Sequence, residues 1–412
     1  MAYLDRLRAQ RLMAESDLDA LILLSPESFR YATGAAAGVA TMWRKAGAVA
    51  VLVPADANLP EVAVVSDLFA DAFRRTSHIG DLRVNPLWVE TATFSADMAD
   101  MSAAAAVQAA LEKDGRVAGF SRPTTFDPQT CFRHLADALV DRGLTRGRIG
   151  FEASALSVAD FQPFRAALDG VTVVDATEVI TRMKMVKSPA EIDNLRQAVD
   201  LAEQGIRAIR AAIAPGVTRD ALAETWQAAI ASAGQDIALT GSWEYISVGP
   251  NPWGGNKAVE PGDLVKVDVG CLVDGYTSDS ARTFVFGRPT RQQSELYDAL
   301  RAGFDAGAAL LQPGVALAEV HRVTQEAIRA AGFSAYTRGH FGHGLGADIG
   351  SEQWPFIAAD ASVTFEPGMV MAFECPWYIN GLGALIVENQ LLITDHGHQM
   401  MNTLGLDLTV VG

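Results

Sequence analysis

The pattern of apolar and polar residues in the first half of the chain alternates between helix-like and strand-like stretches. Short apolar runs predict buried strands, and stretches with apolar residues every three or four positions predict amphipathic helices. The predicted helices cover residues 2–15, about 97–113 and about 157–168, and the predicted strands cover 19–24, 48–53, 61–66, 148–152 and 171–175. This alternation is typical of a layered α/β domain. None of these strands is followed by a glycine-rich phosphate loop, which disfavours nucleotide binding.

A strong helix start follows this region. Ser188 is a predicted N-cap, Pro189 stands at the first helical position and Glu191 completes a capping box. A long helix is predicted to follow. Because 412 residues are too many for one ordinary hydrophobic core, we predict two domains, residues 1–182 and residues 183–412.

The second half contains two similar segments, which indicate an internal repeat. Residues 215–234 and residues 313–332 both begin with Pro-Gly-Val, continue as an alanine-rich helix and stop at glycine. Duplication of a unit of two helices and a sheet would explain this repeat, and it would give the domain pseudo-twofold halves. We expect a functional site at the centre, with residues from both halves.

The segment 266–283, KVDVGCLVDGYTSDSART, is predicted to be a β-hairpin with two facing carboxylates. If residues 273 and 274 form the turn, Asp268 lies directly opposite Asp279. If Asp274 and Gly275 form it, the two aspartates are diagonal neighbours on the same face. In a covered site, carboxylates this close need a cation or a bound proton.

Three further residues belong with these aspartates. His343 lies in the glycine-rich segment 339–350, and Glu374 and Glu388 each interrupt an apolar strand. A carboxylate inside such a strand is costly unless it is paired or binds metal. Two aspartates, two glutamates and one histidine suit two divalent ions such as manganese, cobalt, iron or zinc, which hold a hydroxide nucleophile between them near neutral pH.

Charge and cysteine content narrow the possible partners and the compartment. The net charge is −16, from 33 Lys+Arg and 49 Asp+Glu, so neither nucleic acid nor an anionic membrane is an expected partner. The three cysteines do not form a disulfide framework. The N-terminus has no signal-peptide core, and the most apolar run, residues 46–54, is too short to span a bilayer. We expect a soluble cytoplasmic protein.

Residues 182–406 resemble the pita-bread metallohydrolases, which include methionine aminopeptidase, aminopeptidase P, prolidase and creatinase. The resemblance rests on the order and sequence context of the five residues above: Asp268, Asp279, His343, Glu374 and Glu388. It implies that the two aspartates bind a first metal ion. It also implies that Asp279, His343, Glu374 and Glu388 complete the pair of ions, with Asp279 and Glu388 bridging them.

The first domain resembles the smaller domain of prolidase, aminopeptidase P and creatinase through DALILLSPESFRYATG, residues 19–34. The expected fold is therefore an α/β N-terminal domain followed by an α+β pita-bread domain with pseudo-twofold halves. The resemblance also implies a homodimer in which the N-terminal domain caps the partner's site.

Three positions depart from the peptidase pattern. Asn251 stands where the peptidases have a substrate-binding histidine. Gly350, or Ser351 with one insertion, stands where they have a second histidine near the metal, and Ile386 stands where prolidases often have an arginine. These departures bear on Xaa-Pro activity, whereas the metal core does not depend on them.

Other groups are candidates for the missing functions. Glu374 and His340 are the predicted catalytic acid–base groups, and Asp348 and Glu352 are alternatives on the same loop. Arg338 is a candidate partner for a substrate carboxylate. The other predicted substrate contacts are Asn251, Trp253 and Trp377, and the aromatic residues near the motifs also include Trp354 and Tyr378.

Two enzymatic functions and one non-catalytic function remain open. The first is cleavage of a peptide bond by a dinuclear-metal hydrolase similar to Xaa-Pro dipeptidase or aminopeptidase P. The second is hydrolysis or lysis of a small zwitterion, as in creatinase or the dimethylsulfoniopropionate lyase that resembles this family, because aromatic side chains suit a quaternary cation. The third is an interaction protein, which the complete metal set disfavours.

Overall fold

The computed structural model describes residues 2–116, 119–347 and 350–412. Asp348, one of the predicted acid–base alternatives, lies outside these residues. The chain forms two compact units, residues 1–183 and residues 184–412. Within the described residues, none of the helices has the length and apolar content needed to cross a membrane.

The first unit is built on a mixed six-stranded sheet with the order β4-β3-β2-β1-β5-β6. The β1 strand pairs antiparallel with β2 and parallel with β5, so the sheet reverses direction at its centre. The five predicted strands form, and β4 is an additional edge strand. The strands are β1 Ala20–Leu23, β2 Ala50–Pro54, β3 Val62–Ser66, β4 Asp81–Asn85, β5 Arg148–Phe151 and β6 Thr172–Asp175.

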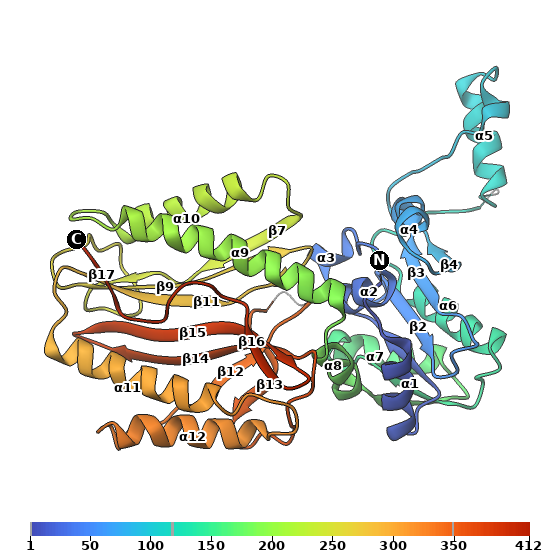
Figure 1. The fold of residues 1–412 in the computed structure, drawn as a ribbon. Coiled ribbons are helices and arrows are strands. Elements are labelled where there is room, and N and C mark those ends of the chain that lie inside the picture. The colour runs from blue at the N-terminus through green and yellow to red at the C-terminus, as the bar shows by residue number, and fades with distance from the viewer. Residues whose placement is uncertain (1, 117–118, 348–349) are drawn as a thin grey trace. The chain divides into compact units, whose positions relative to one another are not determined.

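Helices cover this sheet and connect its strands (Figure 1). The core contains Phe132, Leu135 and Phe164 from two helices, packed on Ile22 and Leu52 of the sheet. The helices are α1 Arg6–Glu15, α2 Pro26–Thr33, α3 Ala40–Trp43, α4 Ala70–Thr76, α5 Ala103–Lys113, α6 Pro128–Asp141, α7 Val158–Ala167 and α8 Thr177–Met185, with short 3-10 turns at Asp67–Phe69, Ala96–Met98 and Ala153–Ala155.

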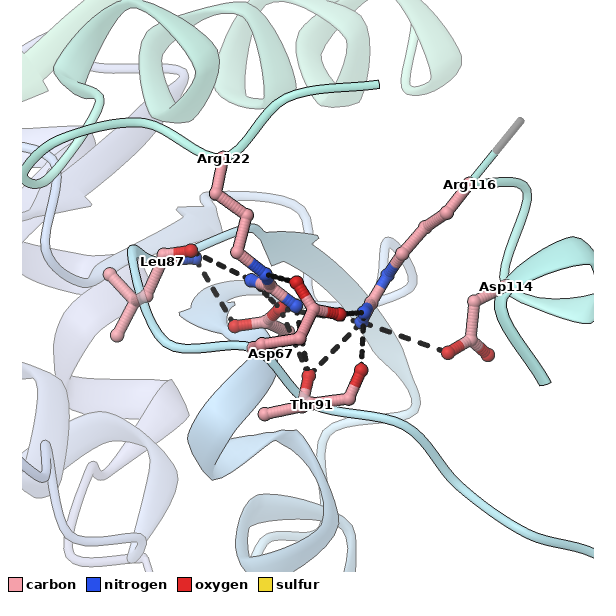
Figure 2. Close-up of polar contacts among 7 residues, drawn as sticks. Asp67, Leu87, Thr91, Asp114, Arg116 and Arg122 are labelled. Atoms are coloured by element: carbon pink, nitrogen blue, oxygen red, sulfur yellow. Dashed lines mark hydrogen bonds and ion pairs between the residues drawn. The ribbon is translucent and has the colours of Figure 1, made fainter. Parts of the chain in front are cut away.

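Two arginines fasten the long connection that carries α5 to the body of this unit (Figure 2). Arg122 donates to the carboxylate of Asp67 and to the carbonyl of Leu87, both at 2.7 Å. Arg116 donates to the hydroxyl of Thr91 at 3.0 Å and lies 3.6 Å from the same Asp67 carboxylate. Both guanidinium groups are therefore satisfied within the chain.

The start of α2 depends on a glutamate far away in the sequence. Glu152 is 5% exposed and accepts hydrogen bonds from the backbone N–H groups of Leu24 and Ser25 at 2.9 and 2.8 Å. The hydroxyls of Ser25 and Ser28 donate to its other oxygen at 2.8 and 2.6 Å. The carboxylate thus lies at the positive end of the helix, where a negative charge is stabilised.

The second unit places two pairs of helices around two sheets (Figure 1). The long helix α9 begins at Pro189 with the predicted capping box between Ser188 and Glu191, which confirms that prediction. The helices are α9 Pro189–Ala212, α10 Arg219–Ala233, α11 Arg291–Ala308 and α12 Leu317–Ala330.

One sheet has the order β10-β9-β11-β17, with β7 and β8 also pairing with β9, and the other has the order β13-β12-β14-β15-β16. Each sheet contributes to its own core, one beneath α9 and α10 and one beneath α11 and α12. The strands are β7 Leu239–Glu244, β8 Ser247–Val248, β9 Leu264–Val273, β10 Tyr276–Thr277, β11 Ser280–Phe286, β12 His340–Gly344, β13 Gln353–Ala358, β14 Val370–Ile379, β15 Gly383–Thr394, β16 Gly397–Met400 and β17 Thr409–Val411.

In both halves, the two helices of the pair pack closely at a glycine. A Cβ on Gly205 of α9 would lie 2.3 Å from the ring of Trp226 on α10. A Cβ on Gly307 of α11 would lie 2.1 Å from the hydroxyl of Thr324 on α12. In each half, a glycine on the first helix lets the second helix approach, as expected for a duplicated unit of two helices and a sheet.

Candidate metal centre

The five predicted metal residues line one cavity of about 920 Å³ within the second unit. Its wall also carries aromatic and basic side chains from several strands and loops. The lining includes Asp268, Asp279, His343, Glu374, Glu388, Lys266, Arg338, Arg219, Trp243, Tyr245, Trp253, Tyr378 and Glu352. Acidic groups from both sheets therefore meet in one space.

The hairpin adopts the second of its two predicted registers. Val273 pairs with Tyr276, so Asp274 and Gly275 form the turn, with φ of 50° and 80°. Asp268 consequently pairs with Ala281, and Asp279, the residue immediately before β11, lies diagonal to Asp268. The backbone N–H of Asp279 donates to the side-chain carbonyl of Gln390 at 3.2 Å, which ties this aspartate to β15.

His343 is positioned by close contact between two strands. Gly342 has φ of 144°, and a Cβ there would lie 2.1 Å from the carbonyl oxygen of Ala372 on β14. The Nδ1 of His343 lies 3.1 Å from the carbonyl oxygen of Gly344. Because a carbonyl only accepts, Nδ1 carries the hydrogen, and Nε2 of the neutral ring is left as a metal ligand.

Glu374 and Glu388 lie opposite each other on β14 and β15. Arg282 fixes the second of them, because its guanidinium donates to the Glu388 carbonyl at 2.6 Å and to the side chain of Asn389 at 2.8 Å. Thr283 bonds the carbonyl and the N–H of Ile386 at 3.0 and 2.8 Å. These contacts join β11 of one sheet to β15 of the other across the centre of the unit.

Three of the five residues converge tightly. One ligand atom each from Asp279, His343 and Glu388 lies within 4.8 Å of the others, and His343 Nε2 is 3.4 Å from Asp279 Oδ2. All three side chains are buried. Within the described part of the chain, Asp279 Oδ1 and Glu388 Oε2 have no hydrogen-bond partner. Buried carboxylate oxygens without donors indicate that a cation belongs here.

The electrostatics of this trio agree with that interpretation. Burial raises the pKa of Asp279 to about 7, although the neighbouring His343 opposes the rise. Burial and repulsion from Asp279 hold the pKa of Glu388 well above its usual range. Burial alone would lower the pKa of His343, but Asp279 outweighs it and raises the value to about 9.

The other two predicted ligands are paired with cations of the chain itself. Lys266 Nζ donates to Asp268 Oδ2 at 2.9 Å. Arg338 Nη2 donates to Glu374 Oε1 at 2.6 Å. Arg338, predicted to hold a substrate carboxylate, thus holds a carboxylate of the protein.

His340 is not among the residues that line the cavity, but its ring approaches two glutamates that do. Its Nδ1 is 3.8 Å from Glu374 Oε1, and its Nε2 is 3.6 Å from Glu352 Oε2. Burial lowers the pKa of His340, with Glu374 opposing. A neutral imidazole close to both glutamates has the chemistry of a proton carrier.

The structure brings only part of the predicted substrate-binding set to the cavity. Trp253 is 69% exposed and stacks on Tyr378 with a centroid distance of 4.6 Å. Asn251 does not line the cavity, and its side chain accepts from the Trp253 N–H at 3.1 Å. Trp377 packs edge-on against Phe333 at 5.2 Å, on the face of β14 opposite Glu374.

Of the positions that depart from the peptidase pattern, two line the cavity and one lies in the interior of a strand. Gly350 and Ser351 line the cavity beside Glu352. Ile386 is fully buried in β15, where it pairs with Pro376.

Lys266 and Tyr245 also line the cavity, but neither was predicted from the sequence. Lys266 stands two positions before Asp268 on the same strand, so alternation alone puts both side chains on one face. Tyr245 follows β7 and reaches the cavity near Lys266, whose Nζ is 6.0 Å from the tyrosine ring. The lysine could have been found by the reasoning that identified the aspartates.

The trio of Asp279, His343 and Glu388 fits one divalent ion, since two carboxylate oxygens and an imidazole nitrogen suit manganese, iron, cobalt or zinc.

Metal ligands must be deprotonated. We therefore expect affinity for Mn²⁺ to fall by at least about tenfold per pH unit from pH 9 to pH 7, because His343 must lose its proton and Glu388, whose pKa is also raised, must be ionised. Below pH 7 the fall steepens, because Asp279 is then also protonated. Titration calorimetry in two buffers of different ionisation enthalpy measures both affinity and proton release. A constant affinity from pH 6 to pH 9 would contradict this expectation.

Two family models together match most of the chain. Residues 193–395 match metallopeptidase family M24, and residues 6–75 and 84–186 match the creatinase/prolidase N-terminal domain.

Individual relatives agree with these matches. The chain is 29% identical over 270 residues to an uncharacterized peptidase, YqhT, of Bacillus subtilis, covering 64% of this chain and 74% of the relative. It is 28% identical over 309 residues to an Xaa-Pro dipeptidase of Lactobacillus helveticus, covering 73% and 81%. The crystal structure of the dipeptidase PepE from Mycobacterium ulcerans superposes with a TM-score of 0.75 at 23% identity, covering 98% and 97%. This likeness confirms the pita-bread fold.

Proposed function

Because this chain belongs to metallopeptidase family M24 and carries a creatinase/prolidase N-terminal domain, we propose that it is an Xaa-Pro dipeptidase or a similar peptidase acting on short peptides. The single observation that carries the proposal is the convergence of Asp279, His343 and Glu388 in a cavity, with two buried carboxylate oxygens lacking donors among the described residues. We assign residues 183–412 as the catalytic domain and residues 1–182 as the N-terminal domain.

The chain's own residues supply ligands and proton transfer. When bound, a divalent ion polarises the scissile carbonyl and makes water a better nucleophile. Glu374 lies on the strand beside Glu388 and would take the proton of the attacking water and pass it to the leaving nitrogen. Arg338 orients that carboxylate through its 2.6 Å hydrogen bond. His340, 3.8 Å from the same oxygen, would relay the proton.

The cavity wall suits a small peptide. Trp253 and Tyr378 stack on each other in its lining, which also includes Tyr245. Flat aromatic faces of this kind pack well against the apolar ring of a proline. We retain Trp253 as a substrate contact and give no such role to Asn251 or Trp377, since neither side chain lines the cavity.

Several finer expectations stay predictions. The five predicted ligands provide atoms for two divalent ions, and manganese, cobalt, iron and zinc all suit them. A homodimer and a cytoplasmic location also stay predictions. Each has a direct measurement: metal analysis, light scattering and fractionation of cells.

Peptide cleavage is favoured over the small-zwitterion alternative. The identified relatives are peptidases by name, and the chain matches a metallopeptidase family over its site-bearing domain. The wide cavity, about 920 Å³, also exceeds what a molecule of creatine size would fill.

The test is proline release. The full chain is stripped of metal and reconstituted separately with Mn²⁺, Co²⁺, Fe²⁺ and Zn²⁺, and its metal content is measured. Xaa-Pro dipeptides and tripeptides are then compared with Xaa-Ala peptides of the same length. We expect release from the Xaa-Pro set. No cleavage of either set by metal-loaded protein would overturn the proposal and direct the search to cationic zwitterions.

A further inference from the structure

We infer that the centre binds one divalent ion and that the ammonium of Lys266 takes the place of the second. The inference rests on the proposed metal-dependent function but disagrees with the two-ion expectation. It begins from how the five predicted ligands are divided. Three of them lie together, and no lysine or arginine among the described residues forms an ion pair with the carboxylates of Asp279 and Glu388, whereas Asp268 and Glu374 are each paired with such a cation.

The contact between Lys266 and Asp268 is built into the fold. Lys266 lies on β9 between its partners Ser247 of β8 and Thr283 of β11, so its backbone is held on both sides. The side chain is only 4% exposed, and its Nζ lies 2.9 Å from Asp268 Oδ2. The side chain therefore has little room to turn toward solvent.

Aromatic rings hold the ammonium in this position. Lys266 Nζ is 5.3 Å from the ring centroid of Tyr378 and 6.0 Å from that of Tyr245. A cation near the faces of two tyrosines is attracted by their π-systems, and burial strengthens the attraction. The site thus holds a fixed positive charge beside Asp268, the carboxylate that a second metal ion would need as a ligand.

Charge balance leads to the same stoichiometry. The four predicted carboxylate ligands, Asp268, Asp279, Glu374 and Glu388, face the two cations that pair with them, Lys266 and Arg338. Arg219 also lines the cavity but pairs with Asp220 and Glu244, and the Glu352 side chain is 56% exposed, so these charges are left out of the balance at the buried centre. The difference, two negative charges, is balanced by one divalent ion. A second divalent ion would leave a surplus of positive charge in a space where the carboxylates are largely removed from water, and it would lie against the ammonium of Lys266.

The function of Glu374 fits this arrangement. A carboxylate that binds a metal ion through both oxygens is a poor proton carrier. Here Arg338 engages Glu374 Oε1 from the side, and His340 approaches the same oxygen. Glu374 is therefore better placed to carry protons than to serve as a fixed ligand.

The experiment counts metal ions rather than relying on activity. Full-length protein is stripped with a chelator, reconstituted with excess Mn²⁺, passed through a desalting column and analysed for manganese per chain. Electron paramagnetic resonance then distinguishes an isolated Mn²⁺ ion from an exchange-coupled pair. The wild type is expected to hold one ion per chain with the spectrum of isolated Mn²⁺.

Lys266→Met keeps the length of the apolar stem and removes the charge. This variant is expected to hold two ions per chain and to show the coupled spectrum, and Lys266→Gln serves if the methionine variant does not fold. Arg219→Met is the matched control, because Arg219 lines the same cavity but pairs with Glu244 instead of a predicted ligand. It is expected to retain the wild-type count of one.

Two results would overturn the inference: a coupled pair in the wild type, or a single ion in both Lys266 variants. The peptide assay separates this failure from failure of the proposed function. Wild-type protein with two ions that releases proline retains the function and refutes the role of Lys266. Wild-type protein with one ion that cleaves no peptide supports the role of Lys266 and refutes the proposed function. Protein that binds no metal refutes both.

Discussion

Glu388→Gln is expected to lower kcat/KM for a responsive Xaa-Pro peptide by at least about a thousandfold while the protein stays folded. Glu388 is 2% exposed, and its Oε2 lacks a donor among the described residues. The amide has nearly the same shape, but it replaces a negative ligand oxygen with a neutral group. Loss of metal-assisted stabilisation of developing charge is worth several kcal/mol, or about three powers of ten in rate.

The same variant is expected to be more stable than the wild type when both are free of metal. Burial and the charge of Asp279 raise the pKa of Glu388, so the folded state binds its proton more strongly than the unfolded state does. Above the unfolded pKa of a glutamate, the ionised group therefore costs stability, and glutamine removes that cost, by about 1–3 kcal/mol. Urea denaturation of metal-free protein at pH 8 measures the gain.

The control for both measurements is Glu295→Gln, a change on the exposed surface of α11 where Glu295 pairs with Arg291. It should alter neither activity nor stability by more than a few tenths of a kcal/mol. An active Glu388→Gln protein would show that this glutamate does not bind the essential ion. A less stable metal-free protein would show that the glutamate has an unrecognised partner.

Glu152→Ala is expected to destabilise the first unit by about 3–5 kcal/mol. The substitution leaves two backbone N–H groups and two serine hydroxyls, all buried or nearly so, without their acceptor. It also removes a negative charge from the start of α2. Because domains are stable by only about 5–15 kcal/mol, the loss should be visible as early unfolding of β1, β5 and α2.

Hydrogen exchange followed by mass spectrometry during urea denaturation resolves the two units. Faster exchange is expected in the first unit, with little change around β14 and β15. Glu152→Gln should be intermediate, because its amide keeps one acceptor but turns a donor toward other donors. Glu112→Ala on the exposed face of α5 is the control. Exchange rates in Glu152→Ala equal to those of the control would contradict the role assigned to this carboxylate.

Local interactions explain why several elements could be read from the sequence. The capping box of Ser188 and Glu191 and the turn at Asp274 and Gly275 each involve residues at most three positions apart. Their signals do not depend on the rest of the fold. The predicted apolar strands formed because β-branched and aliphatic runs in this α/β arrangement are buried on both faces.

Other elements were not predicted although some had a signal. The α6 helix was not predicted, although it starts with a recognisable local signal, Asp127 as N-cap and Pro128 at the first helical position. The β4 strand is different, because its sequence DLRVN is mostly polar. It forms as a parallel edge strand beside β3. The backbone hydrogen bonds to β3 stabilise this strand, because its own side chains have no strand-like apolar pattern.

By itself, the sequence determined the two-part organisation, the hairpin and the acidic set, because periodicity and turn chemistry act over a few residues. It also contained the relation between Lys266 and Asp268 and the opposite orientations of Glu374 and Trp377, since strand alternation fixes both. Only the tertiary structure decided which carboxylates are paired. Arg338 reaches Glu374 across 36 positions, and Glu152 reaches Ser25 across 127. Such contacts depend on how strands and helices pack, and the sequence contains no local pattern for them.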